Sequence, residues 1–329
     1  MEDAEGFLGG LRGRRVVLDE VHRLANPSEL LKIAADHYGD VKIIATGSST
    51  LGASSRFRDT LTGRKVDYWL TPMITRDLID LGRDDLQHRL LHGGLPPFFL
   101  EDTLPEEQFQ EWMDAYWAKD IQELFRLERR YSFQRFLELL MAQSGGMFEA
   151  TRFARPCEVS RTTISNYLSV LEATFVVHVI RPFRTYRPTE IVSAPKVYCF
   201  DTGFVCYHKG WHDLRREDLG LLWEHFVLNE IQAQLQSRRI NYWRNKRGHE
   251  VDFVISWRNQ PPVVIECKWS ASDVDPAGIN AFRRQYGEGD TFVVVNDVDR
   301  PYRRSFGETQ VTIIGLADLM QVLHSLKAT

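Results

Sequence analysis

The segment HEVDFVISWRNQPPVVIECKW, residues 249–269, limits the possible folds more than any other part of the chain. Two short apolar runs flank a Pro-Pro loop, and this arrangement predicts two paired β-strands. Three charged residues interrupt runs that otherwise consist of Val, Phe and Ile: Asp252, Glu266 and Lys268. Charged residues seldom occupy the interior of a sheet without partners, so these three are candidates for a functional site.

The spacing of these charges predicts that they converge. Side chains alternate faces along a strand, so Glu266 and Lys268 share one face, and a hairpin through residues 256–262 brings Asp252 beside Glu266. Adjacent carboxylates repel each other unless a cation intervenes, and a hard divalent metal bound through oxygen supplies that cation. The lysine could then orient, or help to deprotonate, a metal-bound water. The alternative is a lysine–carboxylate ion pair that caps the end of a sheet.

A third acid lies on a predicted helix, in GLLWEHFVLNEIQAQLQ, residues 220–236. Glu224 falls within the apolar stripe rather than on the polar face. The stripe is Leu221, Leu228, Ile231 and Leu235, and the face expected to be solvated is His225, Asn229, Gln232 and Gln236. An unpaired carboxylate in the stripe would be costly, so Glu224 needs a partner, and the metal site is the candidate.

The order Glu224, Asp252 and then Glu266-Cys267-Lys268 resembles the PD-(D/E)XK nuclease superfamily. The resemblance implies that Asp252 and Glu266 bind Mg²⁺ or Mn²⁺, that Lys268 assists the attacking water, and that Glu224 is accessory. The function implied is metal-dependent phosphodiester hydrolysis. Val251 stands where the proline that names the superfamily would be. A second interpretation is a nuclease-like fold that only docks DNA or protein, and a third is an inactive relic.

The N-terminal residues have strand, helix, strand character, which predicts a parallel sheet. The strands are expected near residues 15–24 and 41–47, with a helix at 28–37 between them. The stretch VVLDE, residues 16–20, resembles a Walker B strand. That resemblance implies that Asp19 holds Mg²⁺ through water and that Glu20 polarises the hydrolytic water.

Further residues are candidates for contact with a nucleotide phosphate. Thr46 and Ser48 follow the second strand, at a position that resembles sensor 1 of AAA ATPases. Arg64 could approach a phosphate from its own or a neighbouring subunit, or could be a surface or lid-packing arginine. No GxxxxGK[ST] loop precedes Val16. We therefore expect a truncated or relic ATPase module that does not hydrolyse ATP as written, with ATP bound only in a full-length form.

The complete set of motifs is similar to the bacterial and archaeal AAA-family ATP-binding proteins that carry an uncharacterised C-terminal domain. The motifs are TGSSTL (46–51), LTGR (61–64), PMITRDL (72–78), GGLPPFF (93–99), YWAKDI (116–121), PKVYCFDTG (195–203) and WEHFVLNE (223–230). The resemblance implies an α/β chain with a truncated AAA core (1–76), a helical lid (77–145), a winged-helix-like unit (146–209) and a nuclease-like domain (210–329). The last domain is expected to run helix, three strands, helix, two strands, helix.

Two segments are candidates for nucleic-acid contact. Residues 153–180 read as helix, turn, helix, strand and resemble a winged helix, with Ile164, Leu168 and Leu171 buried and Arg161, Ser165 and Ser169 outward. The alternative for this unit is packing or partner docking. Arg244, Lys246 and Arg247 lie just before Asp252, where a nuclease would grip phosphates. Their alternative is a solvated hairpin edge.

Composition narrows the partners that we expect. The net charge is −4, which argues against a wholesale nucleic-acid coat but leaves room for a local basic face. No apolar run approaches the ~20 residues that span a bilayer, and the four cysteines show no metal-type spacing. We expect a cytoplasmic protein that contacts DNA, and further copies of itself through the AAA module, and does not contact a membrane.

Overall fold

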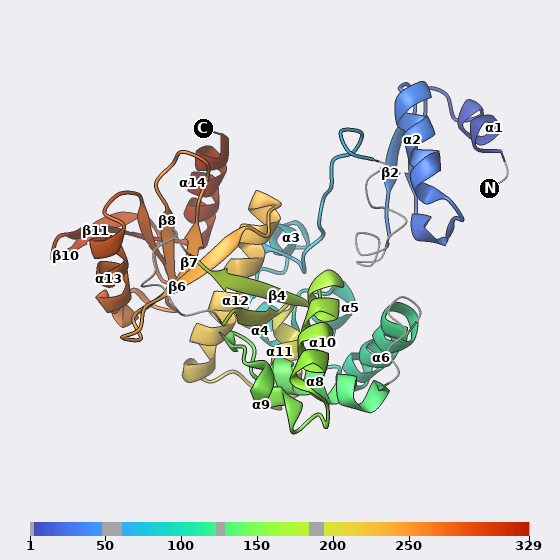
Figure 1. The fold of residues 1–329 in the computed structure, drawn as a ribbon. Coiled ribbons are helices and arrows are strands. Elements are labelled where there is room, and N and C mark those ends of the chain that lie inside the picture. Colours follow the sequence, from blue (N-terminus) through green and yellow to red (C-terminus); the bar gives the residue numbers. More distant parts are fainter. Residues whose placement is uncertain (1–2, 48–60, 123–128, 184–193, 329) are drawn as a thin grey trace. The chain divides into compact units, whose positions relative to one another are not determined.

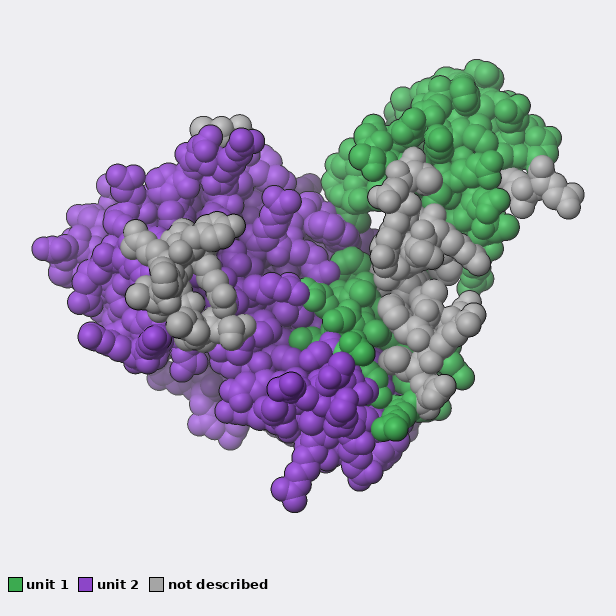
Figure 2. Space-filling model, in the orientation of Figure 1, with its two compact units in different colours: residues 1–68, 113–130, 166–176 green, residues 69–112, 131–165, 177–329 purple. Residues whose placement is uncertain are grey.

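The computed structural model of the protein describes residues 3–47, 61–122, 129–183 and 194–328, and its mixed architecture confirms the α/β class. The chain forms two compact units, coloured separately in Figure 2. The first comprises residues 1–68, 113–130 and 166–176, and the second comprises residues 69–112, 131–165 and 177–329. The division into four segments by sequence stays a prediction.

The N-terminal part of the first unit contains the predicted strand, helix, strand order. Strands β1 (Arg15–Leu18) and β2 (Lys42–Ala45) pair in parallel with Val16 opposite Ile43, and α2 (Pro27–His37) connects them. Apolar side chains of α1 (Ala4–Gly9), α2 and the two strands form one small core. The prediction of a parallel pair is therefore confirmed, and it sets the loop ends after β1 and β2 side by side.

Nine strands of the described residues form one mixed sheet in the second unit (Figure 1). Their order is β10-β11-β9-β8-β7-β6-β4-β5-β3. The strands are β3 (Gly146–Met147), β4 (Val177–Pro182), β5 (Lys196–Cys199), β6 (Ile240–Arg244), β7 (Glu250–Ile255), β8 (Val263–Cys267), β9 (Thr291–Val294), β10 (Tyr302–Phe306) and β11 (Thr309–Ile314). Strands from the expected winged-helix segment thus continue the same sheet as the strands of the expected nuclease-like segment.

The second unit also contains helices. They include α3 (Thr75–Asp80), α4 (Leu86–His92), α5 (Pro96–Phe99), α8 (Arg130–Ala142), α9 (Ala150–Ala154), α11 (Thr202–Lys209), α12 (Arg216–Leu235), α13 (Ala277–Gln285) and α14 (Leu316–Ala328). Helix α6 (Glu106–Tyr116) and helix α10 (Arg161–Ala173) have residues in both units, as does α8, whose Arg130 belongs to the first unit. On α10 the predicted pattern is confirmed, since Ile164, Leu168 and Leu171 are buried while Arg161 is exposed.

The prediction of two strands after α13 is wrong, because β9, β10 and β11 are three. Strand β10 is difficult to predict from the sequence because it lies at the edge of the sheet and four of its five residues are exposed. An exposed edge strand does not need a run of apolar residues, and the sequence YRRSF of β10 contains no such run.

The prediction that one face of α12 is solvated is also wrong. His225, Asn229 and Gln232 are buried, as are Leu228 and Ile231. Other elements cover both faces of the helix, including α14, α11 and strand β8. Neighbouring elements decide whether such a helix can bury a polar side chain, as Ser144 does by bonding His225, and a pattern within one helix does not reveal those neighbours.

Candidate active site

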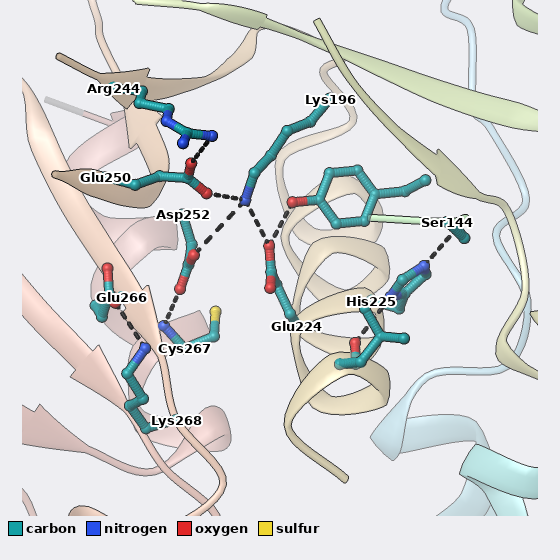
Figure 3. Close-up of polar contacts among 12 residues, drawn as sticks. Ser144, Lys196, Glu224, His225, Arg244, Glu250, Asp252, Glu266, Cys267 and Lys268 are labelled. Atoms are coloured by element: carbon teal, nitrogen blue, oxygen red, sulfur yellow. Dashed lines mark hydrogen bonds and ion pairs between the residues drawn. The ribbon is translucent and has the colours of Figure 1, made fainter. Parts of the chain in front are cut away.

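The antiparallel pairing of β7 with β8 brings the predicted residues together. Phe253 lies opposite Ile265 and Val254 opposite Val264, so the next position along the hairpin places Asp252 at the end of β8. Its Oδ2 accepts a hydrogen bond of 2.8 Å from the backbone N–H of Cys267. Figure 3 shows Asp252, Glu266 and Lys268 gathered around this point. The hairpin and the convergence predicted from the sequence are both present.

Glu266 is buried beside Lys268 at the end of β8. The Lys268 ammonium donates to Glu266 Oε1 at 2.7 Å, whereas Glu266 Oε2 finds no hydrogen-bond partner among the described residues. Burial and the neighbouring Asp252 together raise the pKa of Glu266 to about 8. At neutral pH this carboxyl group is therefore mostly protonated unless a cation offsets its surroundings.

Asp252 and Lys268 respond to the same environment in opposite ways. Burial, followed by the charge of Glu224, raises the pKa of Asp252 to about 6. Burial works to lower the pKa of Lys268, but Glu266 and Asp252 outweigh it and raise that pKa above its usual value. Lys268 therefore stays an ammonium ion at neutral pH, which suits it to donate hydrogen bonds rather than to accept a proton.

Glu224 has the partners that its place on α12 demands, and they are protein side chains. The Tyr198 hydroxyl donates a short hydrogen bond to Glu224 Oε1, and Lys196 Nζ lies 3.2 Å from the same atom. Both donors come from β5 and lie in a strand that is buried along its whole length. The carboxylate predicted to need a partner thus finds a lysine and a tyrosine.

Lys196 is the site residue that sequence reasoning missed. Its Nζ lies 2.5 Å from Glu250 Oε1, 3.2 Å from Glu224 Oε1 and 3.9 Å from Asp252 Oδ1 (Figure 3). The Lys196 side chain is only 7% exposed. The sequence does contain a signal for it: a lysine is the first residue of the otherwise apolar strand KVYC, and charged residues seldom lie in such strands without a partner.

A second layer of buried contacts supports Tyr198 and α12. The His225 ring meets the Tyr198 ring edge-on, with centroids 5.0 Å apart. His225 Nε2 lies 2.6 Å from the Ser144 hydroxyl, and His225 Nδ1 lies 2.8 Å from the Leu221 carbonyl oxygen. Burial lowers the pKa of His225 to about 4, so the ring is neutral at pH 7. It packs against the Tyr198 ring and helps to hold it in place.

The predicted basic residues occupy three different settings. Arg244 contacts Glu250 at 3.5 Å and so touches the edge of the site. Lys246 and Arg247 are exposed in the turn between β6 and β7, where Asn245 Oδ1 accepts from the Arg247 N–H. Arg161 begins α10 and is exposed. Lys246 and Arg247 therefore project from the hairpin whose second strand carries Asp252.

Two carboxylates of the site have the chemistry of magnesium ligands. Among the described residues, no group of three or more His, Cys, Asp or Glu side chains is arranged to hold a metal. Asp252 and Glu266 supply two carboxylates, and the unpartnered Oε2 of Glu266 is a buried oxygen with a free lone pair. Mg²⁺ is commonly bound through one or two carboxylates, with waters and substrate phosphate completing its shell.

The N-terminal acids form a separate, more open arrangement. Asp19 Oδ1 accepts a short hydrogen bond from the Thr46 hydroxyl and a 3.1 Å bond from the Glu20 N–H. Glu20 adopts a left-handed backbone with φ 52°. Arg64 pairs with Asp36 at 2.6 Å, and Ser48 lies outside the described residues. The structure thus joins Asp19 to Thr46 and turns Arg64 toward an acid of α2.

Comparison with known proteins divides the chain into three matched parts. Residues 2–79 match the family described as AAA domain. Residues 83–215 and 219–318 match two families that are each described as a domain of unknown function, DUF8612 and DUF4143. The N-terminal part is thus similar to AAA domains, and the C-terminal similarity brings no activity with it.

Two relatives extend across these parts. Over 263 residues the chain is 27% identical to an uncharacterized protein of Mycobacterium bovis and equally to one of Mycobacterium tuberculosis. The alignment covers 77% of this chain, and the chain spans 58% of the length of each relative. In the described parts of the chain, no helix has the length and apolar character of a membrane span.

Proposed function

We propose that the chain couples an AAA-type, ATP-binding part to a site for metal-dependent phosphodiester hydrolysis at Asp252, Glu266 and Lys268. One observation carries the hydrolytic proposal. Two buried carboxylates meet at the end of β8, and one of their oxygens, Glu266 Oε2, has no partner among the described residues. A buried oxygen of this kind normally has a hydrogen-bond or metal partner, so its exception calls for a ligand.

The side chains divide the chemistry between them. A bound Mg²⁺ or Mn²⁺ would activate water and neutralise charge on a phosphate. Asp252 and Glu266 would hold that ion, and burial, which raises the pKa of each, would favour an added positive charge beside them. Lys268 remains an ammonium ion 2.7 Å from Glu266, so its role is to orient a phosphate oxygen or the attacking water and not to remove a proton.

The surroundings favour a nucleic acid as the phosphodiester. Lys246 and Arg247 are exposed on the β6–β7 turn, and Arg244 reaches the site through Glu250. Basic side chains at this position would contact backbone phosphates without reading sequence. Arg161, exposed on α10, is a further candidate contact.

The AAA-like part supports a nucleotide-binding role. Asp19 and Thr46 are hydrogen-bonded where two parallel strands end, which is where such folds bind ligands. Asp19 would hold the Mg²⁺ of a bound ATP, and Glu20 would polarise water. Assembly of several copies through this part is the corresponding proposal for partners.

A second candidate is a module that binds nucleic acid or protein without cleaving it. Lys196 favours it, because its ammonium already neutralises part of the charge of Glu224, Glu250 and Asp252 without a metal. A buried lysine shared among carboxylates also occurs in purely structural settings.

Incubation with nucleic acids separates the two candidates. The chain is mixed with single- and double-stranded DNA and RNA in Mg²⁺ or Mn²⁺, beside Asp252→Asn, Glu266→Gln and Lys268→Met. Glu308→Gln, in the exposed turn after β10, is the matched control. Cleavage that the three site variants lose and the control keeps supports the hydrolase. Binding without cleavage, equal in all variants, supports the second candidate and contradicts the first.

A further inference from the structure

The carboxylates of the site fall into two groups that differ in their cations. Glu224 and Glu250 contact Lys196 at 3.2 Å and 2.5 Å, and Glu250 also contacts Arg244. Glu266 contacts Lys268 through one oxygen only, and its other oxygen has no partner among the described residues. Asp252 stands between the groups, 3.9 Å from Lys196 and hydrogen-bonded to the Cys267 N–H.

The position of the Lys196 ammonium is fixed by its own strand and by α12. Tyr198, two residues along β5, donates to the same Glu224 oxygen that Lys196 contacts. The ring of Tyr198 is held against His225, which is itself bonded to Ser144. A lysine side chain is ordinarily mobile, but here the ammonium is buried among three carboxylates, which leaves it little freedom.

An ammonium in this place has a definite electrostatic effect. It satisfies carboxylates that would otherwise be strong oxygen ligands for a hard cation. It also repels a second cation placed within a few ångströms, because like charges in a poorly solvated site interact strongly. The only buried carboxylate oxygen without a partner in the described parts of the site lies on the other side, at Glu266.

We propose that Lys196 is a built-in counterion that limits the site to one divalent ion, held by Asp252 and Glu266, and denies Glu224 and Glu250 to a second. This inference rests on the proposed function in assuming that Asp252 and Glu266 bind a divalent ion. It makes Lys196 a positioning residue, since it would act by fixing carboxylates and by excluding a cation, and it would not contact the reacting atoms. A two-metal arrangement would then require loss of the lysine.

Counting bound Mn²⁺ tests this inference. Titrations of the full chain are followed by calorimetry and by the electron paramagnetic resonance signal of free Mn²⁺. Glu266→Gln defines any ions bound elsewhere. Above that baseline we expect one ion per chain in the wild type and in Lys196→Arg, and two in Lys196→Met, the second bound at least tenfold more tightly than any second ion in the wild type. Lys327→Met, which removes a lysine that donates to the Leu235 carbonyl, should still bind one.

A second neutral variant protects the test against a failure to fold. Lys196→Gln removes the positive charge, keeps a side chain that can donate hydrogen bonds, and leaves Glu224 and Glu250 in place, so it should also bind two ions. One ion with unchanged affinity in every Lys196 variant overturns the role of Lys196 and leaves the proposed function standing. No ion in the wild type but one in Lys196→Met overturns the proposed function and, with it, the proposal that the lysine limits the site to one ion. No ion in any variant overturns both.

Discussion

The two acidic sites of this protein both lie where neighbouring strands end, but they balance charge differently. Asp19 is exposed and meets a hydroxyl and a backbone N–H. Asp252 and Glu266 are buried and depend on Lys196 and Lys268. Water screens an exposed carboxylate, whereas a buried one requires cations supplied by the protein or a ligand. The difference teaches that the charges of the buried site are balanced by the protein's own side chains, whereas the charge of exposed Asp19 can be screened by solvent.

The largest expected effect comes from removing the buried cation. Lys196→Met leaves Glu224 and Glu250 without their ammonium in a site that excludes most water. Breaking a buried ion pair on one side is typically worth about 3–5 kcal/mol of stability. We expect a loss of that size in urea-induced unfolding followed by circular dichroism, with part of it restored by Mn²⁺. A loss below about 1 kcal/mol, the range of surface pairs, would break the comparison.

An intermediate effect concerns pH and the buried histidine of β4. Burial, followed by nearby Arg238 and His225, lowers the pKa of His178 to about 3 from its usual 6.5. Between these pH values the unfolded chain binds a proton at His178 that the folded chain does not. The loss of stability linked to His178 is therefore absent above about pH 6.5 and grows as the pH drops. One such histidine contributes about 1.4 kcal/mol per pH unit, or ~2 kcal/mol at pH 5.

Replacement of this histidine isolates its share. His178→Phe should reduce the difference in unfolding free energy between pH 7.5 and pH 5 by ~2 kcal/mol relative to the wild type. Urea titrations at the two pH values measure it. His37, exposed on α2, offers the matched control, and His37→Phe should leave the difference as it is in the wild type. Identical pH dependence in all three proteins would show that His178 is not buried as described.

The smallest expected effect, that of Thr46→Val, is compared with removal of one hydroxyl at the buried site. Tyr198→Phe deletes the donor to partly buried Glu224, and hydrogen bonds to charged groups contribute about 1.5–3 kcal/mol. Thr46→Val deletes the donor to exposed Asp19, and a surface substitution of this kind usually changes stability by less than about 0.5 kcal/mol. Thermal unfolding of the two variants compares them directly. Equal losses would mean that burial does not distinguish the sites.

The sequence supports some parts of this description because their signals are local. The β7–β8 hairpin follows from two apolar runs around Pro-Pro, and the parallel β1–β2 pair follows from strand, helix, strand order. The convergence of Asp252 with Glu266 and Lys268 follows from alternation along a strand. Each inference uses residues within a few tens of positions, where periodicity and turn chemistry decide the outcome.

Other parts could not be predicted because their causes are distant in the chain. Lys196 meets Glu224 and Glu250 only because β5 and β7 belong to one nine-stranded sheet. His225 is buried because Ser144 and Tyr198 cover it, although its spacing on α12 matches a solvated face. A pattern within one helix cannot reveal which elements cover that helix. The sequence of a single strand likewise does not determine the order of the strands in a sheet.

The location of a bound Mn²⁺ tests the central claim most directly. Anomalous scattering from crystals grown with Mn²⁺ reports the position of the ion without relying on activity. The account predicts one peak within bonding distance of an Asp252 oxygen and Glu266 Oε2, with Lys196 still in contact with Glu250. A peak coordinated by Glu224 and Glu250 in place of the lysine, or no peak near Glu266 at a saturating concentration, would contradict it.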